Sequence, residues 1–264
     1  MRSFSVASGK GGVGKTSFVI NLSLALSQLN QRVVIFDADL GLANVDIMLG
    51  LSPKFDIRYV LNGTLTLKEI IYPTEYKFSI IPAGAGVYEL TQLNSSQKLL
   101  LKAQMEEALY PYDFLFFDIS AGITDNVLFF SQLADERIVL VTPEPTSMAD
   151  AYAYIKVVSK KGRVKNFQLV VNMAKSEEEG KKTYQQLLYV IEKFLPEVKL
   201  SLLGILPYDD CVKKAIRSQV PYLILCPDTK LSGKVKEIAY KLLNQRSQKK
   251  ELEFQEFLER FSQL

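Results

Sequence analysis

The stretch GKGGVGKT, residues 9–16, decides how the rest of the chain is interpreted, because it fits the phosphate-loop pattern G-x-x-x-x-G-K-[ST]. An alternating run, Ser3–Ser8, precedes it, and apolar residues at helical spacing follow it over Thr16–Leu29. In such a loop, glycines let backbone N–H groups converge on phosphate oxygens, and the helix N-terminus adds a positive dipole end. The sequence therefore predicts that Lys15 reaches the β- and γ-phosphates of a nucleotide and that the Thr16 hydroxyl ligates Mg²⁺.

Strand-like and helix-like segments alternate along the rest of the chain. The strand-like segments are uniformly apolar, which is typical of a parallel sheet covered by helices on both faces. They are Arg32–Phe36, Lys77–Ile81, Phe114–Phe117, Arg137–Val141, Gln168–Val171 and Ser201–Leu206, and the helical patterns are Gln97–Ala108, Met148–Val158, Glu179–Phe194 and Leu231–Asn244. We predict one α/β phosphate-loop domain over residues 1–245, with a mostly parallel twisted sheet of about seven or eight strands.

Composition excludes several classes of function. The chain has 264 residues, of which 48% are hydrophobic and 23% charged, so wholesale disorder is excluded. It has no histidine, which rules out Ser-His-Asp and Cys-His catalysis and His-ligated zinc. The net charge of +3 does not by itself indicate nucleic acid. Apolar runs are too short for a transmembrane helix, and we expect a cytoplasmic protein.

The two cysteines, Cys211 and Cys226, cannot form a four-cysteine metal site within one chain. Their spacing, without a C-x-x-C motif, also argues against iron–sulfur carriage. We expect both to be reduced residues of the core or of loops.

A second interpretation of the same loop is open at this point. Gly9, Gly11 and Gly14 also satisfy G-x-G-x-x-G, and Asp37 follows at about the spacing of a dinucleotide fold, which would indicate an oxidoreductase. That interpretation gives Lys15 and Thr16 no role and predicts no acid on a distant strand. Asp118 is such an acid, because it ends the apolar FLFF segment where a Walker B aspartate would complete the Mg²⁺ shell.

The loop KGGVGKT resembles the deviant Walker A motif of the MinD/ParA family of ATPases. The similarity continues at DADLGLANVD (Asp37–Asp46), FFDISAG (Phe116–Gly122) and VTPEPTSMADAY (Val141–Tyr152). These stretches together most resemble the flagellar-number regulators of that family, the FlhG/FleN type. Ser120 stands where the second switch of the family usually has glycine or proline.

The resemblance implies a role for each matching residue. In this family two subunits enclose two ATP molecules, and the lysine that matches Lys10 reaches the phosphates of the opposite subunit. Asp39 in the first switch would position the attacking water, and Gly122 in the second switch would sense the γ-phosphate. The implied catalytic residues are Lys10, Lys15 and Asp39; the metal residues are Thr16, Asp37 and Asp118; and the nucleotide-binding residues are Gly9, Lys10, Gly11, Gly12, Val13, Gly14, Lys15, Thr16, Glu144, Asn172, Pro207 and Asp209.

The residues alone leave alternatives for four of these. Lys10 could be a solvated loop charge, Asp37 and Asp39 could cap the next element, and Asn172 could be a turn residue.

The implied function is that of a switch ATPase that dimerises with ATP, hydrolyses it to ADP and phosphate, and regulates flagellar number or placement. The implied cofactors are ATP and Mg²⁺, and the implied partners are a second copy of the chain and proteins of flagellar assembly. A MinD-like role at the division site and a ParA-like role in partition are alternatives. DNA is not expected as a partner, because the basic residues between 156 and 165 are better explained as a solvated face.

The C-terminal segment 246–264 is predicted to be an amphipathic helix. Its large apolar residues share a stripe of about 120°, and they are Phe254, Phe257, Leu258, Phe261 and Leu264. MinD-type proteins end in a helix that docks on the membrane, so this face could contact the inner side of the plasma membrane or a partner. The glutamates of the segment weaken attraction to an anionic surface, and folding back on the domain is the alternative.

Overall fold

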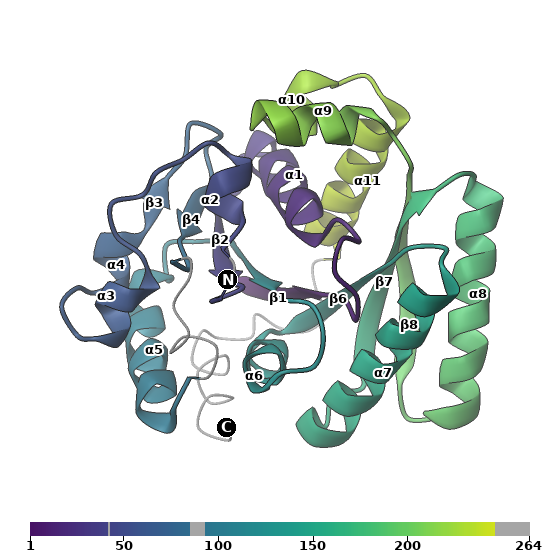
Figure 1. Ribbon diagram of the computed structural model, residues 1–264, viewed down its shortest axis with the longest axis horizontal. Coiled ribbons are helices and arrows are strands. Elements are labelled where there is room, and N and C mark those ends of the chain that lie inside the picture. The colour runs from purple at the N-terminus through teal and green to yellow at the C-terminus, as the bar shows by residue number, and fades with distance from the viewer. Residues whose placement is uncertain (42, 85–92, 246–264) are drawn as a thin grey trace.

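The apolar segments of the chain form the centre of one eight-stranded sheet, as seen in a computed structural model that describes residues 1–41, 43–84 and 93–245 (Figure 1). The strand order is β3-β4-β2-β5-β1-β6-β7-β8, and all neighbours are parallel except β3 and β4. The strands are β1 Arg2–Ala7, β2 Val33–Ala38, β3 Tyr72–Pro73, β4 Ser79–Ile81, β5 Phe114–Ile119, β6 Glu136–Val141, β7 Asn166–Ala174 and β8 Lys199–Pro207. The predicted α/β fold with a mostly parallel sheet is confirmed.

Helices cover both faces of this sheet. They are α1 Lys15–Gln28, α2 Val45–Met48, α3 Ile57–Leu61, α4 Leu67–Ile70, α5 Ser95–Ala108, α6 Asp125–Leu133, α7 Pro145–Gly162, α8 Glu177–Phe194, α9 Cys211–Ser218, α10 Tyr222–Leu225 and α11 Lys230–Asn244. Strand side chains alternate between two apolar clusters: Phe116 packs with α1 and α11, whereas Phe117 packs with α5 to α8. This alternation explains why the strands are apolar throughout.

Helix α1 is buried almost all round, because β-strands cover one side and α11 packs against another. Ile20 and Leu24, which fall off its main apolar stripe, are 2% and 3% exposed. The helix that begins at the phosphate-loop motif is therefore held rigidly in the core.

The order of the strands decides between the two interpretations of the glycine-rich loop. Strand β5 lies between β1 and β2, and its Asp118 is in register with Val6 on one side and with Asp37 on the other. In a dinucleotide fold the second strand pairs directly with the first. The oxidoreductase alternative is therefore wrong, and the topology instead places the two acids side by side at the carboxyl ends of neighbouring strands.

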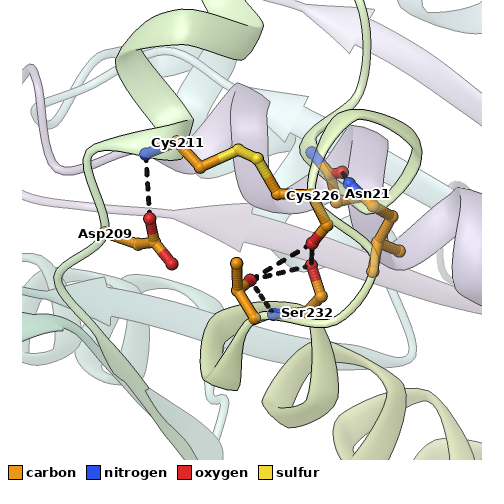
Figure 2. The surroundings of a disulfide bond; sticks show 7 residues. Asn21, Asp209, Cys211, Cys226 and Ser232 are labelled. Atoms are coloured by element: carbon orange, nitrogen blue, oxygen red, sulfur yellow. Dashed lines mark hydrogen bonds between the residues drawn. A yellow bond between two sulfur atoms is a disulfide. The ribbon is translucent and has the colours of Figure 1, made fainter.

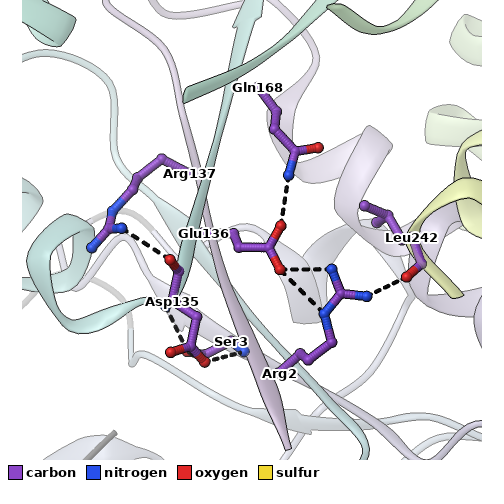
Figure 3. A network of polar contacts seen from close by, with 7 residues as sticks. All are labelled: Arg2, Ser3, Asp135, Glu136, Arg137, Gln168 and Leu242. Atoms are coloured by element: carbon purple, nitrogen blue, oxygen red, sulfur yellow. Dashed lines mark hydrogen bonds and ion pairs between the residues drawn. The ribbon is translucent and has the colours of Figure 1, made fainter. Parts of the chain in front are cut away.

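The two ends of the described chain meet at the amino-terminal ends of the central strands β1 and β6 (Figure 3). The Arg2 guanidinium donates to Glu136 Oε1, with its Nη2 at 2.6 Å, and also to the Leu242 carbonyl at the end of α11. Glu136 Oε2 accepts from Gln168 Nε2 on β7 at 2.6 Å. This network ties β1 to β6, β7 and α11.

Residues 246–264, with the predicted apolar face Phe254, Phe257, Leu258, Phe261 and Leu264, lie outside the described residues, so the amphipathic helix stays a prediction. Over residues 1–41, 43–84 and 93–245, no helix has the length and hydropathy needed to cross a bilayer.

Candidate nucleotide-binding site

The loop between β1 and α1 needs glycine for two different reasons. Gly12 and Gly14 have φ angles of 78° and 89°, a conformation that side chains disfavour. Gly9 passes so close to α7 that an added Cβ would lie 2.2 Å from the backbone carbonyl carbon of Asp150. At Gly11 and Gly12, by contrast, a Cβ would meet no atom within 4 Å. The backbone there borders open space that suits phosphate oxygens.

Ser8, the residue before the loop, joins three parts of the site. Its Oγ accepts a hydrogen bond from Lys15 Nζ at 3.0 Å and donates one to the Lys10 carbonyl at 2.6 Å. Its own carbonyl accepts from the N–H of Gly122 at 3.2 Å, which fixes the second-switch segment to the end of β1. Sequence reasoning missed this residue; its only signal is a serine that directly follows the first strand segment and directly precedes the motif.

Lys15 is partly buried, and this burial lowers the pKa of its ammonium group, against the opposing effect of the Asp118 and Asp39 charges. The ammonium therefore has a hydroxyl partner and two nearby acids, but no carboxylate within ion-pair distance among the described residues. The Lys15 ammonium is therefore placed to form a strong, charge-assisted hydrogen bond with an anionic ligand.

Asp118 fits a cation. It is 2% exposed, and burial raises the pKa of its carboxyl to about 6, although the Thr16 hydrogen bond and the Lys15 charge act in the opposite direction. Its Oδ1 is buried and has no hydrogen-bond partner among the described residues. A buried carboxylate oxygen without a partner calls for an explanation, and a bound ion is one that fits here.

Asp37 has its oxygens engaged by the backbone of the first switch. Oδ1 accepts from the N–H of Asp39 at 3.1 Å, and Oδ2 accepts from the N–H groups of Asn44 and Val45 at 3.0 and 3.1 Å. Burial and the Asp118 charge raise its pKa well above the usual range, against these hydrogen bonds. For Asp37 the capping alternative thus describes what the structure shows, and contact with Mg²⁺ stays a prediction.

Asp39, which Asp37 holds through its backbone, is partly buried close enough to Lys15 and Asp118 for its charge to affect the pKa of both. Lys10 and Glu144 are brought together in one chain: Lys10 Nζ lies 2.7 Å from Glu144 Oε2 and 3.4 Å from Thr146 Oγ1. The sequence did not predict this pair. Its two side chains are 43% and 60% exposed, so the contact is weak and easily exchanged.

The predicted base-binding residues lie at the ends of β7 and β8. Asn172 Nδ2 donates to the Val13 carbonyl of the loop at 2.8 Å, and a Cβ on Gly14 would come within 2.6 Å of that nitrogen. Pro207 ends β8, and the Asp209 carboxylate accepts from the Cys211 N–H at the start of α9 at 2.8 Å. Asn172 is therefore attached to the loop itself, whereas Asp209 belongs to the segment that leads into α9.

Cys211 and Cys226 form a disulfide, so the expectation of two reduced cysteines is wrong (Figure 2). They are 15 positions apart in the sequence, but α9 and α10 pack against each other and bring their Cα atoms to 6.6 Å. This distance suits a disulfide, and spacing along the sequence did not indicate it.

Magnesium does not require a cluster of protein ligands. Among the residues that the structure describes, no group of three or more aspartate, glutamate, cysteine or histidine side chains could hold a metal ion. Mg²⁺ in phosphate-binding sites is usually held by one or two carboxylates together with phosphate oxygens and water. Thr16 and Asp118 fit that requirement.

Comparisons with known proteins agree with this geometry. The profile of a family described as ParA, NUBPL iron-transfer P-loop NTPase, matches residues 1–243. The antiactivator FleN of Pseudomonas aeruginosa is 38% identical over 90% of this chain and 84% of its own length. The flagellum site-determining protein YlxH of Helicobacter pylori is 31% identical over 89% of this chain and 79% of its own length.

Among solved structures, the septum site-determining protein MinD of Pyrococcus horikoshii, complexed with Mg-ADP, superposes with a TM-score of 0.75. It is 24% identical and covers 91% of this chain and 95% of its own. At that identity the likeness concerns the fold alone.

Proposed function

Because this chain belongs to the ParA family of P-loop NTPases, we propose that it binds ATP with Mg²⁺ at residues 9–16, dimerises in that state, and hydrolyses ATP to ADP and phosphate. The observation that carries the proposal is the Oδ1 of Asp118, which is buried close to Thr16 and Lys15 and has no hydrogen-bond partner in residues 1–41, 43–84 and 93–245. Asp118 and Thr16 would hold Mg²⁺, which when bound supplies charge that stabilises the phosphate oxygens.

Each of the chain's own residues has a defined task in this proposal. Lys15 moves its hydrogen bond from Ser8 Oγ to a phosphate oxygen, which offers a charge-assisted contact in place of a neutral one. Asp37 holds the backbone of Asp39 through the N–H of that residue, and Asp39 orients the attacking water. Gly122, tied to Ser8, reports the presence of the γ-phosphate to the second switch.

Lys10 couples nucleotide to dimerisation. In the single chain its ammonium pairs with Glu144, both side chains being substantially exposed. An exposed pair of this kind contributes about 0–1 kcal/mol, so Lys10 leaves it readily for the phosphates bound by a second copy. Glu144 then lies at the same interface, which agrees with its implied contact to the partner's nucleotide.

The similarity to FleN and YlxH supports a role in setting flagellar number or placement, with proteins of flagellar assembly as partners. MinD-like and ParA-like tasks would use the same ATP-driven dimer with other partners. A peripheral contact with the membrane through residues 246–264 is part of this proposal. Deleting the gene in its source cell should change the number or position of flagella; unaltered flagella would favour one of the other tasks.

Light scattering tests the molecular proposal. With Mg²⁺ and ADP the chain should be a monomer, and with a nonhydrolysable ATP analogue a dimer. Lys10→Ala should still bind nucleotide and stay monomeric. Lys165→Ala, which removes a lysine from an exposed pair with Glu197 at 3.9 Å, is the matched control and should dimerise normally. A dimer of Lys10→Ala would remove the role across the interface, and no response to the analogue in wild type would end the proposal.

A further inference from the structure

Cys211 and Cys226 bound a segment that is hydrogen-bonded to Asp209, to α1 and to α2, three parts of the chain that border the candidate nucleotide site, and we propose that they are a redox modification site. Their disulfide opens and closes by exchange with a dithiol, and its state sets how tightly the chain holds nucleotide. This inference rests on the proposed function, because it concerns affinity for the same ligand.

The geometry of the pair supports direct oxidation without rearrangement of the backbone. Cys211 is the first residue of α9 and Cys226 is the residue that ends α10, and their Cα atoms are 6.6 Å apart (Figure 2). The sequence contains two cysteines in all, so neither sulfur has another thiol of the same chain to pair with.

The first contact with the site runs through Cys211. Its backbone N–H donates to Asp209 Oδ1 at 2.8 Å. Asp209 lies two residues after Pro207, the last residue of β8, and between them the Tyr208 N–H donates to the Ala174 carbonyl at 2.9 Å. Any shift of the first turn of α9 therefore moves the carboxylate that is predicted to flank the base.

The second contact runs through α10 to the helix that begins at the phosphate loop. The Leu223 N–H donates to Asn21 Oδ1 on α1 at 2.9 Å. The carbonyl of Cys226 accepts from Ser232 Oγ at 2.7 Å, which fixes the turn between α10 and α11. The sulfur of Cys226 is thus attached to backbone that is held against α1.

The third contact runs from the turn between α9 and α10 to the first switch. Gln219 Nε2 donates to the carbonyl of Ile47 on α2 at 2.7 Å, and α2 is the helix whose start Asp37 caps. With the disulfide closed, the segment from Cys211 to Cys226 is held at both ends and contacts Asp209, α1 and α2 together. With the disulfide open, its ends can separate, and those contacts lose a shared restraint.

The exposure of the two cysteines decides which sulfur an external thiolate attacks first. Cys226 is partly exposed, whereas Cys211 is 6% exposed. A thiolate of an external dithiol attacks Cys226 Sγ, and Cys211 Sγ leaves and takes up a proton. The second thiol of the reductant then displaces Cys226 Sγ, which also takes up a proton. The protein gains two electrons and two protons, and the dithiol becomes a disulfide.

Closing the disulfide favours the arrangement that binds nucleotide, because the free chain then has less conformational freedom to lose on binding. We expect reduction to weaken affinity for ADP about fivefold or more, the lower range of coupling between sites.

The experiment titrates the whole chain with a fluorescent ADP derivative and Mg²⁺ after treatment with oxidised glutathione or with dithiothreitol. Free thiols are counted in each sample from the mass added by an alkylating agent. Cys226→Ser, at the more exposed sulfur, should bind as the reduced wild type does and should not respond to dithiothreitol. Trypsin provides a readout without nucleotide, because Lys213 and Arg217 lie in α9 and should be cut faster after reduction.

Three results would overturn the inference. Two free thiols after oxidation would exclude the disulfide itself. Equal ADP affinity in the oxidised and reduced chain would leave the proposed function intact and remove the coupling. A redox response that persists in Cys226→Ser would assign the effect to another group. Absence of ADP binding in both states is a different outcome, because it refutes the proposed function together with the inference.

Discussion

Replacing Asp118 by asparagine is expected to stabilise the nucleotide-free chain at neutral pH, although this carboxylate is the group proposed for Mg²⁺. Burial raises the pKa of the carboxyl from 3.8 to about 6. A carboxyl with a higher pKa in the folded than in the unfolded state binds its proton more tightly when folded. The stability contributed by this proton is fully present below about pH 3.8 and is lost as the pH rises through about 6.

The magnitude follows from these two pKa values, which differ by about 6 minus 3.8, or about 2.2. At about 1.4 kcal/mol for each pKa unit, ionising the buried carboxyl lowers the free energy of unfolding by about 3 kcal/mol. Roughly half of this falls between pH 5 and pH 7.5. Asparagine has nearly the same shape without the charge. The free energy of unfolding of Asp118→Asn, relative to wild type, should therefore be greater at pH 7.5 than at pH 5 by about half of the 3 kcal/mol. Removing the Asp118 charge also removes its repulsion of the Asp37 carboxylate, because this charge helps to raise the pKa of Asp37. This second effect also stabilises the variant, so the expected direction of the change is the same.

Urea unfolding followed by circular dichroism, with a chelator and without nucleotide, measures the effect at both pH values. Asp113→Asn is the matched control, because hydrogen bonds from Arg32 lower the pKa of Asp113. The ionised Asp113 carboxylate stabilises the fold fully at any pH above the pKa that this group has in the unfolded chain. The control variant should therefore lose the same stability at pH 5 and at pH 7.5. A gain of Asp118→Asn that does not depend on pH, or a loss at pH 7.5, would refute the reasoning. The same variant should release little phosphate from ATP in Mg²⁺.

Three further changes test other parts of the site. Gly9→Ala should destabilise the fold by about 1–3 kcal/mol or more, because the new Cβ would lie 2.2 Å from the backbone of Asp150; Gly11→Ala, with open space around its Cβ, should leave the urea midpoint unchanged. Equal midpoints would contradict the close approach. Asp39→Ala should keep ATP and stay dimeric while phosphate release falls about a hundredfold or more; normal hydrolysis would show that Asp39 is misassigned. Deleting residues 248–264 should abolish sedimentation with anionic liposomes, and unchanged sedimentation would favour a tail that folds back.

The parts of the fold that could be predicted are those whose segments are long enough to show a period. The pattern over Thr16–Leu29 locates α1 within one residue at each end, and FLFF locates β5. Helix α10 and strand β3 have four and two residues and carry no period, so they escaped prediction. Helix α6 was missed because its sequence, DNVLFFSQL, is buried over most of its length and shows little polar face.

In the candidate site, the sequence predicts the residues that belong to one contiguous motif. It does not predict the contacts between residues that are far apart in the chain. The loop residues follow from a contiguous motif whose backbone conformation is local. The Lys10–Glu144 pair joins residues 134 positions apart, and it exists because β1 and β6 are neighbours in the sheet. The disulfide likewise depends on how α9 and α10 pack. Ser8 could be found only after the strand end and the two lysines had been placed together.

The connection between the two ends of the described chain has a consequence for synthesis. Strand β1 and α1 are made long before α11, which packs against α1 and accepts a hydrogen bond from the Arg2 guanidinium at the Leu242 carbonyl. Until α11 is made, a nascent chain therefore carries the GKGGVGKT sequence without the packing of α11 against α1. We therefore expect a nascent chain to bind nucleotide only after α11 has emerged, which would keep products truncated before α11 out of the proposed ATP-driven cycle.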